Sequence, residues 1–107
     1  MTDVFRYQTE DGKEPLTEWL NSLRDKRTQA KLRVRLKRLA VGLLGDCSPV
    51  GEGVLELREH FGSGYRVYFA RHGENVVILL LGGDKESQVQ DIERAKKYWR
   101  DWKRRQA

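Results

Sequence analysis

The sequence lacks most of the features that would indicate a secreted, membrane-spanning or metal-dependent protein. Its single cysteine, Cys47, cannot form an internal disulfide, and no second Cys or Cys/His cluster indicates a zinc site. The longest apolar run, VVILLL, falls far short of the roughly 20 residues that cross a bilayer. Residues 1–10 do not have the pattern of a signal peptide. We therefore expect a cytoplasmic protein with no membrane partner and with no metal or other cofactor.

The charge of the chain is mainly positive. Charged residues make up 35% of the 107 residues, hydrophobic residues make up 38%, and the mean hydropathy is −0.74. The formal net charge is +5 and the isoelectric point is near 9.6, which favours an anionic partner without naming one. The length is typical of one domain, so we expect residues 1–107 to form a single unit.

The apolar periodicity predicts an α+β fold with the element order β-α-α-β-β-β-α. The connections between the last three expected strands are short, which predicts antiparallel hairpins and a mainly antiparallel sheet. Residues 45–53 contain Pro49 and three glycines, so we expect a loop there. Strands are expected at residues 3–10, 54–58, 65–70 and 75–81, and helices at residues 13–23, within 24–45, and after a cap at Asp84 or Ser87. Such a chain would pack one helix layer on one sheet layer.

Two of the expected strands alternate between apolar and polar residues. In VLELR the leucines share one face, and Glu56 and Arg58 share the other. In YRVYFA the apolar residues alternate in the same way with Arg66 and Tyr68. The long helix and the last helix each carry an apolar stripe that should be buried. These stripes consist of Leu32, Leu36, Leu39 and Leu43, and of Val89, Ile92, Ala95, Trp99 and Trp102.

The basic residues gather in two helical segments. Residues 24–38 hold eight Lys or Arg against one acid, and residues 94–105 hold seven against one. At helical spacing, five of the basic residues within 24–38 form one narrow stripe, which lies roughly opposite the leucine stripe of the same helix. Such a stripe could bind RNA, bind an acidic segment of a partner protein, or simply be a solvated face. The candidate RNA- or ribosome-binding residues are Arg24, Arg27, Lys31, Arg35, Arg38, Arg94 and Lys97.

Arg58, Arg66 and Lys85 would form a cationic cleft if the sheet brings them to one face. Cleavage of RNA by its own 2′-hydroxyl needs charge stabilised at phosphorus and protons moved at two oxygens. Arginine suits the first task because its planar fork stays charged and binds two phosphate oxygens. Lys85, His60 or a tyrosine such as Tyr68 would then have to move the protons. Equally, the two arginines could pair across strands with Glu56 or Glu59.

Two segments of the chain, PVGEGVLELREHFGSGYRVYF and LLLGGDKESQVQDIERAK, resemble the RelE/ParE toxin superfamily, and most closely its HigB-like branch of phage-derived addiction-module killer proteins. The resemblance extends over nearly the whole chain. It implies a RelE-like α+β fold and a toxin of a type II toxin–antitoxin operon. It further implies an endonuclease that cuts mRNA on the ribosome, and a small helix-turn-helix antitoxin as partner.

The resemblance also implies roles for individual residues. Arg66 matches the arginine that the RelE group uses at the scissile phosphate, and Lys85 lies near the position of a second arginine. The RelE lysines on the preceding strand fall near Val54 and Glu56, and the tyrosine of its last helix falls near Asp91. These departures leave His60, Tyr68, Lys85 or Tyr98 to take those roles, or indicate a different mechanism. The candidate catalytic residues are thus Arg66, Lys85, Arg58, His60 and Tyr68.

Two other functions remain open from the sequence. A ParE-like toxin that inhibits DNA gyrase through protein contacts would need no catalytic set, which agrees with the missing lysines. A degenerate toxin or a basic RNA- or protein-binding module would have the charge without toxicity. All three candidates share the expected antitoxin partner, whereas the ribosome and mRNA belong to the nuclease alone.

Overall fold

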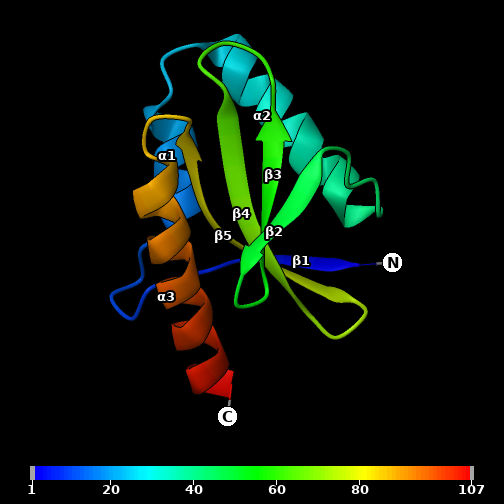
Figure 1. Cartoon of the computed structure of the whole chain (residues 1–107), viewed down its shortest axis with the longest axis vertical. Helices are drawn as coiled ribbons and strands as arrows, with labels where there is room; N and C mark the ends of the chain where they lie inside the picture. Colours follow the sequence, from blue (N-terminus) through cyan, green and yellow to red (C-terminus); the bar gives the residue numbers. More distant parts are fainter. Residues whose placement is uncertain (1, 107) are drawn as a thin grey trace.

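The computed structural model describes residues 2–106 and contains three helices and five strands (Figure 1). Pro15 is the first residue of the first helix, where its missing N–H costs nothing. The Asp25 side chain caps the second helix by accepting a hydrogen bond from the Arg27 N–H at 2.9 Å. The elements are β1 (Asp3–Arg6), α1 (Pro15–Ser22), α2 (Lys26–Ala40), β2 (Cys47–Gly51), β3 (Val54–Glu59), β4 (Tyr65–His72), β5 (Val76–Asp84) and α3 (Gln88–Gln106).

The strands form one sheet in the order β1-β5-β4-β3-β2. β1 runs parallel to β5, and the other neighbouring pairs are antiparallel. The predicted α+β class with a mainly antiparallel sheet is therefore confirmed. The structure also confirms the hairpins that join β3 to β4 and β4 to β5.

The expected loop at residues 45–53 is wrong in part, because it contains the edge strand β2. Cys47 pairs with Leu57 and Pro49 with Leu55, so the order becomes β-α-α-β-β-β-β-α. The glycines and the proline predicted a loop, but a proline is tolerated on an edge strand because one side of that strand needs no partner. The register shifts between Pro49 and Gly51, which marks a bulge at the strand end.

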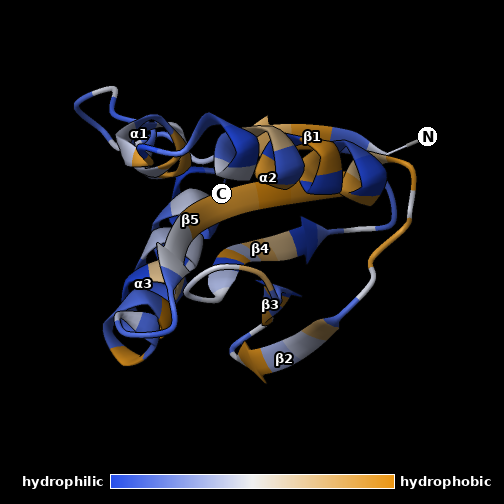
Figure 2. Cartoon of the chain, turned by 90° about the horizontal axis from the view of Figure 1, so that it is seen from above, coloured by the Kyte–Doolittle hydropathy of each residue, from blue (hydrophilic) through white to orange (hydrophobic). Residues whose placement is uncertain are grey.

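Helices cover both faces of the sheet, whereas a single helix layer was expected. Figure 2, seen from above, shows α1 and α2 on one side of the strands and α3 on the other. The core under α1 and α2 includes Leu20, Leu32 and Phe69, and the core under α3 includes Tyr68 and Trp99. β5 lies between β1 and β4 and is buried along most of its length, as its continuous apolar run predicts.

Three sequence expectations about the helices need correction. Arg24 precedes α2, because the helix starts only after the cap at Asp25. Leu43 leaves the leucine stripe and is 59% exposed, since α2 ends at Ala40. Val89 is 78% exposed, and the buried face of α3 begins instead with Asp91.

Within residues 2–106, no helix is both long enough and apolar enough to cross a membrane.

Candidate active site

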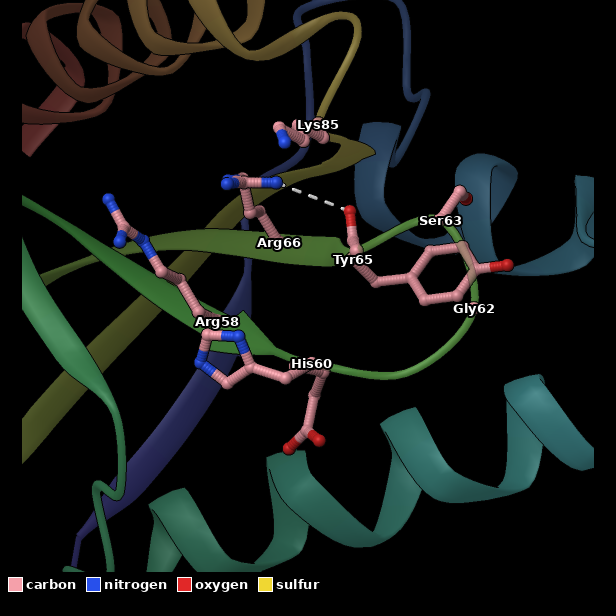
Figure 3. A pocket seen from close by; sticks show the side chains of 9 residues that line it. Arg58, His60, Gly62, Ser63, Tyr65, Arg66 and Lys85 are labelled. Carbon is pink, nitrogen blue, oxygen red and sulfur yellow. Dashed lines mark hydrogen bonds between the residues drawn. The ribbon is translucent and has the colours of Figure 1, made fainter.

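A cavity of about 340 Å³ opens at the end of the β3–β4 hairpin (Figure 3). Its walls come from the end of β3, the hairpin turn, the start of β4 and the residue after β5. Four of the five candidate catalytic residues from the sequence line it. The lining residues are Arg58, Glu59, His60, Gly62, Ser63, Gly64, Tyr65, Arg66 and Lys85.

Strand register brings the cationic side chains together. Arg58 on β3 lies directly opposite Arg66 on β4, and Arg66 lies opposite Gly83 on β5. Gly83 adds no side chain at that point, and Lys85 follows two residues later. Gly64 has a φ of 79° and lies beside both groups: a Cβ there would stand 3.6 Å from Arg66 Nη1 and 3.8 Å from Lys85 Cβ. This left-handed turn thus places Arg66 and Lys85 on one side of the cavity.

The carboxylate of Glu56 lies beneath both arginines and is fully buried. Arg58 Nε donates to Glu56 Oε1 at 2.7 Å, and Arg66 Nε lies 3.6 Å from Oε2. Gln88 Nε2, at the start of α3, donates to the same Oε2 at 2.9 Å. Burial favours the neutral acid, but the hydrogen bonds from Arg58 and Gln88 outweigh it and lower the pKa of Glu56. Glu56 is therefore a carboxylate at neutral pH.

The two arginines differ in their exposure. The Arg66 side chain is 12% exposed, and its Nη1 donates to the Gly64 carbonyl at 3.3 Å (the dashed line in Figure 3). Its Nε–H is buried and has no hydrogen-bond partner in the described part of the chain, because the 3.6 Å from Nε to Glu56 Oε2 is too long for a hydrogen bond. The Arg58 side chain is 40% exposed. Arg66 is thus a largely buried part of the cavity wall, whereas Arg58 lies at the rim of the cavity.

His60 is paired with an acid that the sequence did not single out. Its Nε2 contacts Asp46 Oδ2, and both side chains are exposed. The hydrogen bond with His60 lowers the pKa of Asp46, which keeps this carboxylate charged beside the ring. The Asp46 carbonyl also accepts the Arg58 backbone N–H at 2.9 Å. The loop before β2 therefore orients one imidazole at the cavity rim.

Tyr68, the fifth candidate catalytic residue, does not line the cavity. It is fully buried on the α3 face, and its hydroxyl has no hydrogen-bond partner among residues 2–106. Burial, together with the negative charges of Glu56 and Asp91, raises the pKa of Tyr68 far above its usual value. The phenol is therefore protonated at neutral pH and lies below the cavity rather than in it.

The basic residues of α2 do not form one uniform surface. Arg35 is half-buried, with its Nη1 2.5 Å from Glu59 Oε1 and its Nη2 donating to the Leu44 carbonyl at 2.9 Å. The Lys31 ammonium lies 4.7 Å from the centre of the Phe61 ring in the hairpin turn. Hence Arg35 and Lys31 help to hold the hairpin turn against α2, while the candidate residues Arg24, Arg27 and Arg38 are exposed.

The two candidates on α3 lie on another side of the molecule. Arg94 Nη2 donates to the Tyr98 hydroxyl at 3.1 Å, and its Nη1 lies 3.8 Å from Asp91 Oδ1. Lys97 is exposed. Neither Arg94 nor Lys97 lines the cavity that contains Arg66.

The structure singles out three further functional candidates: Glu56, which contacts both arginines, Asp46 beside His60, and Gln88. The alternation of β3 already placed Glu56 on the same face as Arg58, and cross-strand pairing was one of the two expectations for the arginines. Asp46 and Gln88 carried no sequence signal, since their contacts depend on how a loop and a helix meet the sheet. Among residues 2–106, no group of three or more His, Cys, Asp or Glu side chains is arranged to hold a metal ion.

Comparison with known proteins places the chain in a family. An uncharacterized protein of Haemophilus influenzae is 47% identical to it over 78 residues, which cover 73% of this chain and 79% of that protein. The family model described as "Phage derived protein Gp49-like (DUF891)" matches residues 18–100, which include every residue that lines the cavity. The chain therefore belongs to the Gp49-like family of phage-derived proteins, the Gp49/HigB-like family of addiction-module toxins.

Proposed function

We propose that this protein is the toxin of a type II toxin–antitoxin module and acts as a ribosome-dependent mRNA endonuclease that needs no metal. The observation that carries the proposal is the cavity in which Arg58, His60, Arg66 and Lys85 meet. Three cationic side chains and one imidazole at a single concave site suit a phosphodiester in its transition state. The family membership agrees with a toxin.

In the proposed reaction, the 2′-oxygen of a nucleotide attacks the adjacent phosphorus and the bond from phosphorus to the 5′-oxygen breaks. Arg58, Arg66 and Lys85 stabilise the charge on the non-bridging oxygens. His60, oriented by Asp46, takes up the proton of the 2′-hydroxyl and then gives a proton to the leaving 5′-oxygen, so that the two proton transfers balance. The products are a 2′,3′-cyclic phosphate and a 5′-hydroxyl. Neither an external nucleophile nor a redox partner is needed.

The partners in this proposal are the ribosome, its bound mRNA, and a cognate helix-turn-helix antitoxin. The exposed basic residues would dock the toxin on ribosomal RNA, since phosphate contacts position a protein without reading sequence. The ribosome would then present the mRNA to the cavity. The docking candidates are Arg24, Arg27, Lys31, Arg38, Arg94 and Lys97, with Arg35 bound mainly to Glu59 and the Leu44 carbonyl.

The test is brief induced expression of the chain and of Arg66→Ala in bacteria, with new RNA 5′ ends mapped within minutes. We expect cuts confined to translated frames, reduced at least about 100-fold in Arg66→Ala, because removing one preorganised donor to a developing oxyanion costs about that much. Arg100→Ala is the matched control, since Arg100 pairs with the exposed Glu52 at 2.8 Å and does not line the cavity. Protein levels are compared by immunoblot.

Other outcomes of this experiment would overturn the nuclease. Growth arrest with intact mRNA and with DNA damage would instead indicate a ParE-like inhibitor of DNA gyrase. The absence of arrest at full protein levels would indicate a degenerate toxin or a basic binding module.

A further inference from the structure

Glu56 is a charged residue in a place where the fold needs none. It is the only fully buried acid within residues 2–106, and its neighbours on the same strand, Val54 and Leu57, are buried apolar residues. Replacing a buried ion pair by apolar side chains of similar size often leaves stability unchanged or raises it. Stability alone therefore does not account for a carboxylate at this position.

Both arginines turn the same part of the guanidinium toward this carboxylate. Arg58 Nε donates to Oε1 at 2.7 Å, and Arg66 Nε faces Oε2 at 3.6 Å. Within residues 2–106, the terminal nitrogens of Arg58 make no hydrogen bond, and those of Arg66 make one, to the Gly64 carbonyl. The ends of both forks therefore remain available to an anion in the cavity, while the inner nitrogens are turned to Glu56.

The Glu56 carboxylate reduces the repulsion between the two arginines. Arg58 and Arg66 are directly opposed across β3 and β4, where two cations repel each other. A carboxylate beneath them offsets that repulsion and restricts the rotation of each side chain, so less ordering is left for the moment at which an anion binds. Gln88 donates to Oε2 at 2.9 Å, which ties the carboxylate to the first residue of α3.

We propose that Glu56 is a positioning residue that holds the guanidinium groups of Arg58 and Arg66 ready for a phosphodiester. Glu56 does not exchange protons with the substrate, because its side chain is fully buried and does not line the cavity. This inference rests on the proposed function for its purpose, but its physical content, an anion site preset by a buried carboxylate, can be tested without any RNA cleavage.

The test compares the unaltered chain with Glu56→Gln, which keeps the shape of the side chain and removes its charge. NMR signals of the arginine Nε–H groups are followed during titration with inorganic phosphate. We expect a protected Nε–H signal for Arg58 that becomes exchangeable in Glu56→Gln, and a phosphate dissociation constant raised about tenfold, since loss of preorganisation weakens binding. The matched control is Glu52→Gln, the same chemical change at an exposed ion pair with Arg100.

Gln88→Ala is a second variant for the case in which Glu56→Gln does not fold. It removes only the hydrogen bond to Oε2, so we expect about a twofold weaker phosphate affinity and a preserved Arg58 signal. Circular dichroism confirms that each variant is folded.

The outcomes separate this inference from the nuclease. If Glu56→Gln folds and binds phosphate as the unaltered chain does, the positioning role is overturned, even where mRNA cleavage is observed. If the affinity falls as expected in a chain that cuts no mRNA, the preset anion site stands and the nuclease proposal fails.

Discussion

The two faces of the sheet are built from the same strands but from different kinds of side chain. On the face covered by α1 and α2, Leu57 and Val67 are buried among apolar residues of both helices. The residue before Leu57 on β3 is Glu56, and the residue before Val67 on β4 is Arg66. Both lie on the face covered by α3, and both are charged. Neighbouring residues of a strand share their backbone environment, so the backbone does not explain the difference.

The α3 face is itself divided along the strands. Its middle holds Tyr68, Leu80 and Trp99 in an apolar core, whereas the end near the β3–β4 turn holds the charged groups and opens into the cavity. The α1/α2 face shows what these strands contain when packing is the only requirement. The α3 face carries charged instead of apolar residues at the end where the cavity lets an anion approach. This difference is the physical reason for assigning the functional site to that end.

The largest effect on stability should come from a substitution on the face covered by α1 and α2. Phe69 is fully buried on β4 among the residues under α1 and α2. We expect Phe69→Ala to lower the free energy of unfolding by about 3–5 kcal/mol through lost burial and a residual cavity, as measured by urea unfolding. Phosphate affinity of the folded variant at low temperature should match that of the unaltered chain. A marked loss of affinity would show that the two faces are not separate in function.

A smaller loss of stability is expected at acidic pH, and it should come from Glu56 at the charged end of the α3 face. A carboxyl group whose pKa is lower in the folded state than in the unfolded chain stabilises the fold above its ordinary pKa, which is 4.5 for glutamate. That contribution is lost as the pH falls through the lowered folded value. The pKa of Glu56 is lowered by its hydrogen bonds, against the effect of burial. The unaltered chain should therefore lose stability below about pH 4.5 more steeply than Glu56→Gln does.

Urea unfolding of the two proteins at a series of pH values measures this difference. The other carboxyl groups titrate in both proteins, so only the difference between the two curves reports on Glu56. Parallel curves would mean that Glu56 gains no more from its partners than from water.

The smallest effect is expected from Tyr68→Phe, in the apolar middle of the α3 face. The Tyr68 hydroxyl is buried without a hydrogen-bond partner among the residues that the structure describes, and a buried polar group without a partner costs free energy. We expect the variant to be as stable as the unaltered chain or up to about 1 kcal/mol more stable, and to cut mRNA at the same rate, because Tyr68 lies outside the cavity. Loss of cleavage with unchanged stability would restore Tyr68 as a group that moves a proton.

Much of the site could be predicted from local patterns. The alternation placed Glu56 and Arg58 on one face of β3, and Arg66 and Tyr68 on one face of β4, because successive side chains of a strand point to opposite sides. Only the register of the assembled sheet shows that the two pairs lie on the same face. The short connections predicted the hairpins that set Arg58 opposite Arg66. The relative depth of these residues could not be predicted, and Tyr68 therefore stood among the catalytic candidates although it lies in the core.

The sequence by itself determined the α+β class, the hairpins, and the alternation of charged and apolar residues within β3 and within β4, because these follow from strand and helix periods and from the lengths of the connections. Only the tertiary structure decided that Glu56 lies beneath two arginines, that Asp46 meets His60, and that β2 forms an edge strand. These features join segments far apart in the chain. Their stability comes from burial and from hydrogen bonds that form only after the sheet is assembled, so no local pattern records them.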